Sequence, residues 1–222
     1  MEEIYGFIHI AVMGEYWRNI LDDQLCYLRH SGLSENTKTI FAGVVGSIDV
    51  PKRLPGIEII DRSRELELNE LFTLRHLKTF CDNNPNCKIW YIHTKGAATY
   101  TVQTQAWRKY MEYFVIEKWE DCVRALDTHD VCGVGWHRNP THHEGLAGFA
   151  GNFWWATSNY IKKLPSDAAS HWERHRAEYN FLSLTNPKVK NFHAPPTAVP
   201  WRESLYGIEY TKNYYGSKIS YE

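Results

Sequence analysis

The sequence predicts an α/β fold, with a central and mostly parallel β-sheet flanked by helices. Two observations carry this prediction. In the first 93 residues, short apolar stretches rich in β-branched and aromatic residues alternate with amphipathic helical stretches. A longer helical stretch then follows, and after it another short apolar one. Such an alternation is typical of parallel strands joined by crossover helices.

The first half of the chain is expected to contain four strands and two helices. In the first helix, Trp17, Leu21 and Leu28 share one face, and the helix ends before Gly32. The second helix is stopped by Pro85. The strands are expected at residues 4–12, 39–45, 57–60 and 88–92, the helices at 15–30 and 68–83, and a loop at 51–56.

The second half opens with the strongest helical pattern of the chain, at residues 103–126. Apolar side chains recur there at three- and four-residue spacing, which predicts a long helix packed on the sheet. We find no repeat and no linker, so we expect one domain over residues 1–222. The remaining elements are expected as a strand at 130–136, a polar loop at 137–145, a Gly-rich apolar segment at 148–155, helices at 158–163 and 168–184, and an irregular tail from about residue 185.

The composition of the 222 residues excludes several classes of protein. A net charge of -1 provides no field that would favour nucleic acid as a partner. The apolar runs are too short to span a bilayer, and residues 1–13 lack the basic start of a signal peptide. The five cysteines are an odd number without a CxxC pair, which favours reduced thiols. We therefore expect a cytoplasmic protein without a membrane span.

The stretch from Lys88 to Gly96 combines a buried strand with an abrupt polar end. His93, Thr94 and Lys95 follow the apolar residues, and Gly96 permits a sharp exit. Open α/β sheets bind ligands at the carboxyl ends of their strands, and a hydroxyl beside a cation suits a phosphate or diphosphate. A strand that simply ends in a polar loop would show the same residues, and the two interpretations weigh about equally.

Two other strand ends are candidates for holding a nucleoside. Small or main-chain groups at Ile10 and Ala11 could hold a flat base, although a plain core strand is favoured by the local sequence. The carboxylate of Asp61 could accept from a base N–H or a ribose hydroxyl, while Arg62 could bind a phosphate. A surface ion pair or a helix cap would explain Asp61 and Arg62 equally well.

The segment 148–155 places an amide among glycines and aromatic residues. Gly151 allows close approach of a ligand, Asn152 offers a donor and an acceptor, and Trp154 could stack on a sugar. The alternative is a buried strand with a bulge. Further along, Glu178 would serve as a general base if its helix aims it at the cleft, although solvent exposure is more common.

Histidines at 137, 142 and 143 beside Glu144 do not match a zinc spacing. They favour a polar loop that closes over a substrate.

These motifs together resemble a known family. The shared pieces are a first strand ending in HIA, the stretch YIHTKG, a helix with Trp107, Arg108 and Met111, the segments GNFWWA and YIKKLP, and Arg176 with Glu178. The set, which spans about residues 4–182, is similar to glycosyltransferases encoded by large DNA viruses of algae, the chlorella viruses, and to related bacterial proteins.

The resemblance implies a GT-A fold, a UDP-sugar donor and a divalent cation, Mn²⁺ or Mg²⁺. It implies transfer of a hexose or deoxyhexose to a glycan hydroxyl, for example on a viral glycoprotein. On this interpretation Ile10, Ala11, Asp61 and Arg62 hold the nucleoside, His93, Thr94 and Lys95 meet the diphosphate, Gly151, Asn152 and Trp154 contact the sugar or acceptor, and Glu178 and Lys95 are catalytic.

The sequence departs from the GT-A pattern in one respect. GT-A enzymes carry an Asp-x-Asp motif that bridges metal and diphosphate, and this chain has none. His93 would then be the metal ligand, or Lys95 would neutralise the diphosphate directly. The alternative function is a non-catalytic domain of the same fold that binds a carbohydrate or nucleotide sugar. A nucleotidyltransferase would need a Gly-rich phosphate loop, and the sequence shows none.

Overall fold

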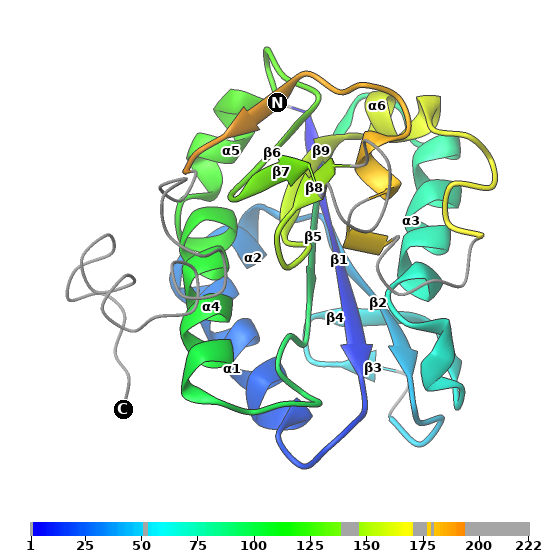
Figure 1. Ribbon diagram of the computed structural model, residues 1–222, viewed down its shortest axis with the longest axis vertical. Coiled ribbons are helices and arrows are strands. Elements are labelled where there is room, and N and C mark those ends of the chain that lie inside the picture. The colour runs from blue at the N-terminus through cyan, green and yellow to red at the C-terminus, as the bar shows by residue number, and fades with distance from the viewer. Residues whose placement is uncertain (1, 51–52, 139–146, 171–176, 179, 194–222) are drawn as a thin grey trace.

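The computed structural model describes residues 2–50, 53–138, 147–170, 177–178 and 180–193. In this part of the chain an eight-stranded sheet has the order β10-β6-β9-β5-β1-β2-β4-β3, and a two-stranded sheet is formed by β7 and β8. Figure 1 shows the sheet between two groups of helices. The predicted α/β fold with a mostly parallel sheet and flanking helices is confirmed.

Most neighbouring strands of the large sheet are parallel. β1 pairs in parallel with β2 and β5, β2 with β4, and β10 with β6. Only β9, which lies between β5 and β6, and the edge strand β3 are antiparallel to their neighbours. The strands are β1 (Glu3–Ala11), β2 (Thr39–Val45), β3 (Arg53–Leu54), β4 (Ile57–Ser63), β5 (Cys87–His93), β6 (Val131–Gly133), β7 (Trp136–Arg138), β8 (Ala147–Phe149), β9 (Trp154–Thr157) and β10 (Val189–Asn191).

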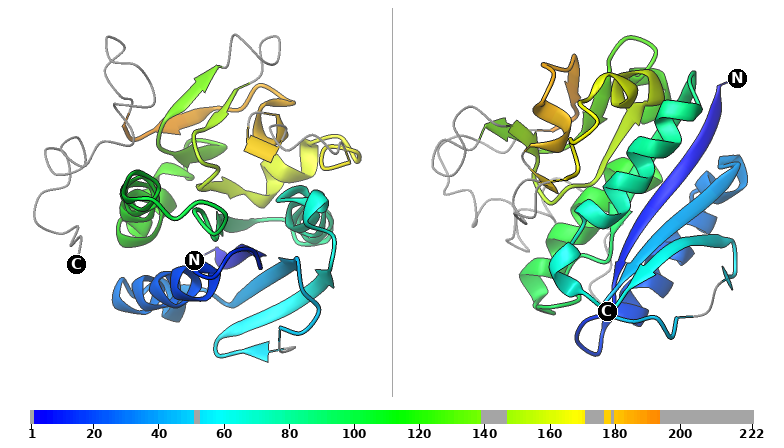
Figure 2. Two further views of the ribbon diagram at one scale, coloured as in Figure 1. Left: turned by 60° about the horizontal axis from the view of Figure 1, so that its bottom comes forward. Right: turned by 90° about the vertical axis from the view of Figure 1, so that its right-hand side faces the viewer.

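Helices cover both faces of the sheet. α1, α2, α4 and α5 lie on one face, and α3 and α6 lie on the other, with α3 crossing in front of the sheet in the right-hand view of Figure 2. None of the helices in the described ranges has the length and apolar character needed to cross a membrane. The α-helices are α1 (Trp17–His30), α2 (Leu33–Asn36), α3 (Leu71–Asn83), α4 (Val102–Glu112), α5 (Trp119–Ala125) and α6 (Ser158–Lys163).

Successive side chains of a strand point to opposite faces of the sheet, so each strand contributes to two cores. In β1, Ile8 and Ile10 join the core beneath α1 and α4, whereas Tyr5 and Phe7 join the core beneath α3. Close packing shows at Gly6, where a Cβ atom would lie 2.1 Å from the ring of Trp90 in the neighbouring strand. Some strands are apolar throughout their sequence because both of their faces are buried.

The long helix expected at residues 103–126 is interrupted. α4 runs into a π-helical turn at Tyr113–Glu117, and α5 follows from Trp119. Side chains satisfy main-chain carbonyls of this turn: the indole N–H of Trp155 donates to Val115 O at 2.8 Å, and the thiol of Cys122 donates to Phe114 O at 3.3 Å. A wider turn is stable here because other donors replace the regular helical ones.

Several predicted bounds differ from the structure. The strand expected at 130–136 is divided into β6 and β7, since Gly135 turns the chain at φ 69°. The helix expected at 168–184 is confirmed at residues 177–178, which are α-helical, and is wrong at 168–169 and from Phe181 onward. Residues 166–169 form a turn and Phe181–Ser183 a 3-10 helix, while 171–176 and 179 lie outside the described residues. The predicted irregular tail contributes β10. α2 and β3 were not predicted.

Candidate functional site

The carboxyl ends of β1 and β5 meet where the topology of the sheet changes direction. α1 leads from β1 to β2 across one face, whereas α3 leads from β4 to β5 across the other. β1 and β5 are neighbours, and His9 is the register partner of His93. Ligands of open α/β sheets bind at such a switch point. The expected phosphate stretch therefore stands where the fold class places a ligand.

Thr94 ties the ends of these two strands together. Its hydroxyl accepts from the main-chain N–H of Ala11 at 3.0 Å, and its own N–H donates to His9 O at 3.0 Å. Thr94 is buried, and the next residues turn away at Gly96, which has φ 93°. The predicted sharp exit at Gly96 is confirmed. Ala11 and Thr94, which the sequence assigned to different ligand groups, touch directly.

Lys95 follows this tie and lies against α4. Its ammonium is 3.6 Å from the centre of the Trp107 ring, a cation–π contact. The side chain is half-buried. A phosphate at the strand ends would compete with the indole for this cation, which stands on a flexible four-carbon stem.

His93 connects the end of β5 to the turn between β8 and β9. Its Nε2 lies 2.8 Å from Gly151 O, and because a carbonyl only accepts, Nε2 must carry the hydrogen. Its Nδ1 lies 3.8 Å from a carboxylate oxygen of Glu70. A second proton on the ring would make this an ion pair. Both nitrogens of His93 thus face protein groups.

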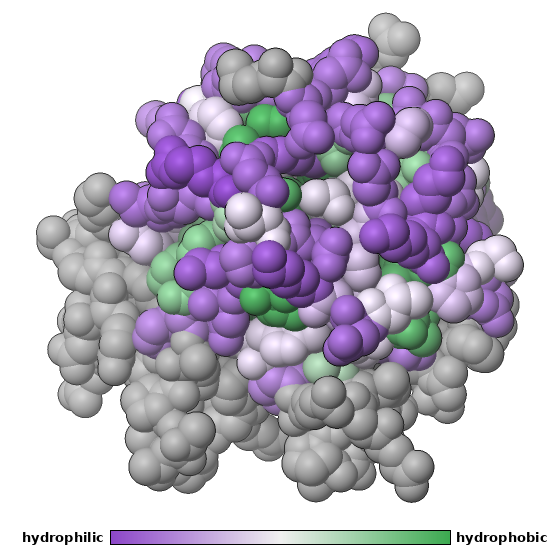
Figure 3. All heavy atoms as spheres, turned by 90° about the horizontal axis from the view of Figure 1, so that it is seen from above, coloured by the Kyte–Doolittle hydropathy of each residue, from purple (hydrophilic) through white to green (hydrophobic). Residues whose placement is uncertain are grey.

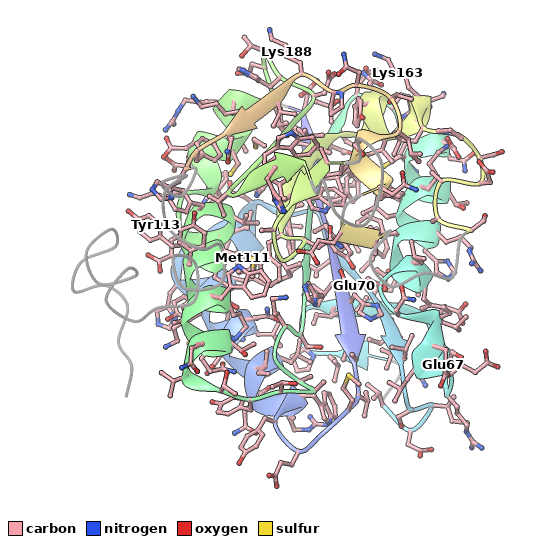
Figure 4. All side chains as sticks on the ribbon, in the orientation of Figure 1. Glu67, Glu70, Met111, Tyr113, Lys163 and Lys188 are labelled. Carbon is pink, nitrogen blue, oxygen red and sulfur yellow. The ribbon has the colours of Figure 1, made fainter. Side chains whose placement is uncertain are left out.

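The turn at Gly151 and Asn152 is held from two sides by carboxylates. Glu178 accepts from Gly151 N at 2.5 Å, and Glu70 accepts from the Asn152 amide at 2.5 Å. The other end of that amide accepts from the indole of Trp154 at 2.7 Å. Asn152 has φ 58° and is 2% exposed, so its side chain is fully used in holding a left-handed turn. In Figure 4, Glu70 and Met111 lie on either side of this turn.

A polar row crosses four strands beneath α3. His93, His9, Gly43 and Asp61 are aligned in register, so they share one face. Three residues of the α3 region, spaced by three, reach this row: Glu70 faces His93, Thr73 Oγ1 lies 2.8 Å from His9 Nδ1, and His76 pairs with Asp61 at 3.1 Å.

Burial at this row lowers the pKa of His9 to about 4, against a smaller opposing effect of the Glu70 charge. His9 is consequently neutral at physiological pH.

The structure brings most of the predicted site residues together. His93, Gly151, Asn152 and Glu178 form one cluster, with Trp154 behind it, and Ala11, Thr94 and Lys95 form the adjoining strand end. Asp61 and Arg62 stand apart, two strands from β1. Asp61 pairs with His76, and Arg62 donates to Ile48 O at 3.3 Å. Ile10 points into the core beneath α1 rather than to the edge.

Sequence reasoning missed Glu70 and Thr73. Both belong to the start of α3, where they look like ordinary helix-start residues. The only available signal was their three-residue spacing with His76, which places three polar groups near one side of the helix.

The residues of the cluster do not fit a divalent cation. In the described part of the chain no three His, Cys, Asp or Glu side chains gather as a metal site requires. Glu70 and Glu178 each accept from an N–H, and His93 Nε2 donates to a carbonyl. A metal would have to displace these contacts, so we derive no chemical step through one. Of the loop at 137–145, residues 139–145 lie outside the described residues.

The chain belongs to the family described as Domain of unknown function (DUF8361), whose model matches residues 11–207. No curated protein matches it. The family description names no activity.

Solved structures resemble the fold only distantly. The bifunctional IspDF from Campylobacter jejuni has a TM-score of 0.46 and 9% identity, over 92% of this chain and 53% of that one. This chain thus spans about half the length of IspDF. Rv0371c from Mycobacterium tuberculosis H37Rv has a TM-score of 0.43 and 12% identity, over 75% and 78% of the two chains. Its complex with manganese has a TM-score of 0.37 and 12% identity, over 74% and 78%. Likenesses at this level do not bear on ligand or activity.

Proposed function

We propose that this protein is a glycosyltransferase of the GT-A type, which moves a hexose or deoxyhexose from a UDP-sugar to a glycan hydroxyl. The observation that carries the proposal is the tie between Ala11 and Thr94 at the switch point, with Lys95 immediately after it. A hydroxyl, main-chain groups and a cation are thereby gathered at the edge where an open α/β sheet binds phosphates.

The diphosphate gains negative charge as the glycosidic bond breaks. Lys95 supplies a stabilising cation by leaving the Trp107 ring for the phosphate oxygens. His93 does not contact the diphosphate in this proposal, since its ring is held by Gly151 O and faces Glu70. In this proposal His93 positions the turn at Gly151 rather than contacting the diphosphate.

Glu178 is the proposed base for the acceptor hydroxyl. One carboxylate oxygen accepts from Gly151 N, which fixes the orientation of the group and leaves the other oxygen for a proton. The side chain is half-buried at the edge of the cluster, against the turn that follows β8. A sugar hydroxyl placed there would be deprotonated as the bond to the donor carbon forms.

A thermal-shift screen of nucleotides and nucleotide sugars tests the donor. We expect UDP or a UDP-sugar to raise the Tm, because a ligand of the folded state alone stabilises it. The screen is run with and without manganese. Absence of any shift at millimolar UDP in both conditions would refute the donor assignment.

Turnover then separates the enzyme from a non-catalytic domain of the same fold. The enzyme releases UDP from a UDP-sugar when an acceptor is present, and a binding domain leaves the donor intact. A Glu178→Gln variant keeps the contact with Gly151 N through its amide oxygen. It should retain the Tm shift with UDP and lose turnover.

A further inference from the structure

Exposed apolar side chains gather at one edge of the sheet. In the described part of the chain, every large apolar residue classed as exposed follows the carboxyl end of a parallel strand. Tyr16 follows β1, Ile48 follows β2, Leu66 follows β4, and Tyr100 and Val102 follow β5. The opposite end of the molecule, seen in Figure 3, is mostly hydrophilic. Exposed apolar groups confined to the ligand edge of an α/β fold indicate a surface that contacts a ligand.

Tyr16 and Tyr100 form a stacked pair within this set. Their ring centres are 4.2 Å apart with planes inclined by 18°, and the residues are 40% and 46% exposed. Tyr16 is the N-cap residue of α1, and Tyr100 comes one residue before Thr101, the N-cap of α4. The pair therefore bridges the loops that leave the two strands of the switch point.

The main chain fixes the two loops against each other. Gly14 has φ 64°, and a Cβ atom there would lie 2.5 Å from Ala97 O. A side chain at residue 14 would push the loops apart, so glycine is required for their close approach. The rings are consequently held in position before any ligand arrives, which lowers the entropic cost of binding.

The position of the pair along the edge identifies the ligand it would meet. Asp61, the nucleoside contact expected from the sequence, is on β4, and Lys95 follows β5, three strand positions further on. Three spacings of ~4.8 Å span roughly 14 Å, about the reach of a nucleoside diphosphate. A donor laid from β4 to β5 would place its sugar near Lys95, at the edge where the chain continues into the loop that carries Tyr100.

We propose that Tyr16 and Tyr100 form a platform on which a sugar ring of the glycan acceptor stacks. This inference rests on the proposed glycosyltransferase function. Because the rings are stacked on each other, the outward face of one ring would contact the C–H groups of the sugar, with the other ring supporting it from behind. Exposed groups beside the pair, the hydroxyls of Thr99 and Thr101 and the carboxylate of Glu15, would contact the sugar hydroxyls.

Saturation-transfer NMR with maltose, cellobiose, lactose and methyl rhamnoside at millimolar concentration tests the platform without a donor. We expect at least one of these sugars to receive saturation from the wild-type chain. The signal should vanish in the Tyr16→Ala/Tyr100→Ala double variant and persist in the Tyr16→Phe/Tyr100→Phe variant. Tyr113→Ala, which removes a half-buried tyrosine from the π-helical turn beyond α4, is the control and should keep the signal. A wild type that binds none of the sugars, or a double alanine variant that binds them equally, overturns the platform.

The effect on transfer distinguishes failure of the platform from failure of the function. Tyr100→Ala should raise the KM for the acceptor about three- to ten-fold, the value of one aromatic contact, and leave the Tm shift with UDP unchanged. An unchanged acceptor KM would overturn the platform while turnover upholds the transferase. Sugar binding in a wild type that neither binds nor turns over UDP-sugars would overturn the transferase and keep the tyrosines as a carbohydrate contact.

Discussion

The main-chain N–H of Ala11 donates to the hydroxyl of Thr94 at 3.0 Å, joining the ends of two adjacent parallel strands through a side chain. Thr94 is 3% exposed, so water cannot replace the hydroxyl. Replacing it by a methyl group would leave a part-buried N–H without an acceptor. We predict that Thr94→Val lowers the free energy of unfolding by about 1–3 kcal/mol. Thr94→Ser, which keeps the hydroxyl, should lose much less. Urea titrations of both variants check this, and equal losses would show that the methyl group, not the hydroxyl, matters.

Lys95→Met tests the cation at the strand end. The variant keeps most of the stem and removes the charge, so the loss of the contact with Trp107 should cost only about 0.5–1 kcal/mol of stability. The transfer rate should fall about ten- to a thousand-fold, and UDP binding should weaken more than uridine binding.

Lys118→Met is the matched control. The ammonium of Lys118 also lies over an aromatic ring, 5.6 Å from the centre of the Tyr113 ring, but Lys118 follows the π-helical turn beyond the C-terminal end of α4. It should leave the rate and UDP affinity unchanged. If Lys95→Met binds UDP and uridine as the wild type does, and turns over normally, Lys95 is not a diphosphate contact.

Asn152→Ala should destabilise the fold rather than only weaken sugar binding. The substitution removes the partner of the Trp154 indole and of the Glu70 carboxylate, and it leaves a left-handed φ of 58° on alanine. We expect a loss of about 2–4 kcal/mol in urea unfolding. Asn152→Gly relieves the backbone and should recover about 1 kcal/mol of this. A fully stable alanine variant with reduced turnover would instead place the amide in ligand binding.

Gly151→Ala separates steric crowding from backbone strain when compared with Gly32→Ala. Both glycines have left-handed φ, 80° and 76°, but a Cβ at residue 151 would lie 2.4 Å from Met111 Sδ, whereas residue 32 has open space. We predict about 1–2 kcal/mol for Gly32→Ala and about 2–5 kcal/mol for Gly151→Ala. Equal losses for the two variants would mean that Met111 moves aside at no cost.

The buried imidazole of His9 predicts a pH dependence of stability. Its pKa is lowered to about 4 in the folded state, from 6.5. Between these values the unfolded chain binds the extra proton, so stability falls as the pH decreases from 6.5 to 4, by up to about 3 kcal/mol. His9→Asn offers Thr73 a polar partner and cannot titrate. The stability gap between wild type and variant, measured by urea unfolding at several pH values, should shrink as the pH is lowered. A gap that stays constant from pH 7 to pH 4 would contradict the assignment.

The elements with clear signals in their own residues were predicted correctly. The strand at 39–45 and the helix at 158–163 match the structure to the residue, because breakers or a capping threonine border them. The helix expected at 168–184 was wrong at both ends, since the apolar spacing there reflects packing of a turn and a 3-10 helix against the core beneath α3, with Ala168 and Phe181 buried.

The candidate site was predictable only in part. A polar strand end follows from the sequence of β5 alone, and so does the need of Asn152 for partners. The identity of those partners does not follow from the sequence, because Glu70 is 82 residues away from Asn152 and β9 must first insert antiparallel beside β5. The register of β4 shifts by one residue between Ala42 and Gly43, and this irregularity decides that Asp61 aligns with the polar row.

The insertion of β9 between β5 and β6 has a consequence for synthesis on the ribosome. β5 can pair with β1 as soon as it emerges, but its other edge stays open until residues 154–157 arrive. At ~5–20 residues per second, the intervening stretch takes roughly 3–12 s. During that interval an apolar strand containing Trp90 and Tyr91 presents unpaired main-chain groups, a template for intermolecular pairing. Nascent chains stalled before residue 154 should therefore recruit chaperones more strongly than chains stalled after residue 157.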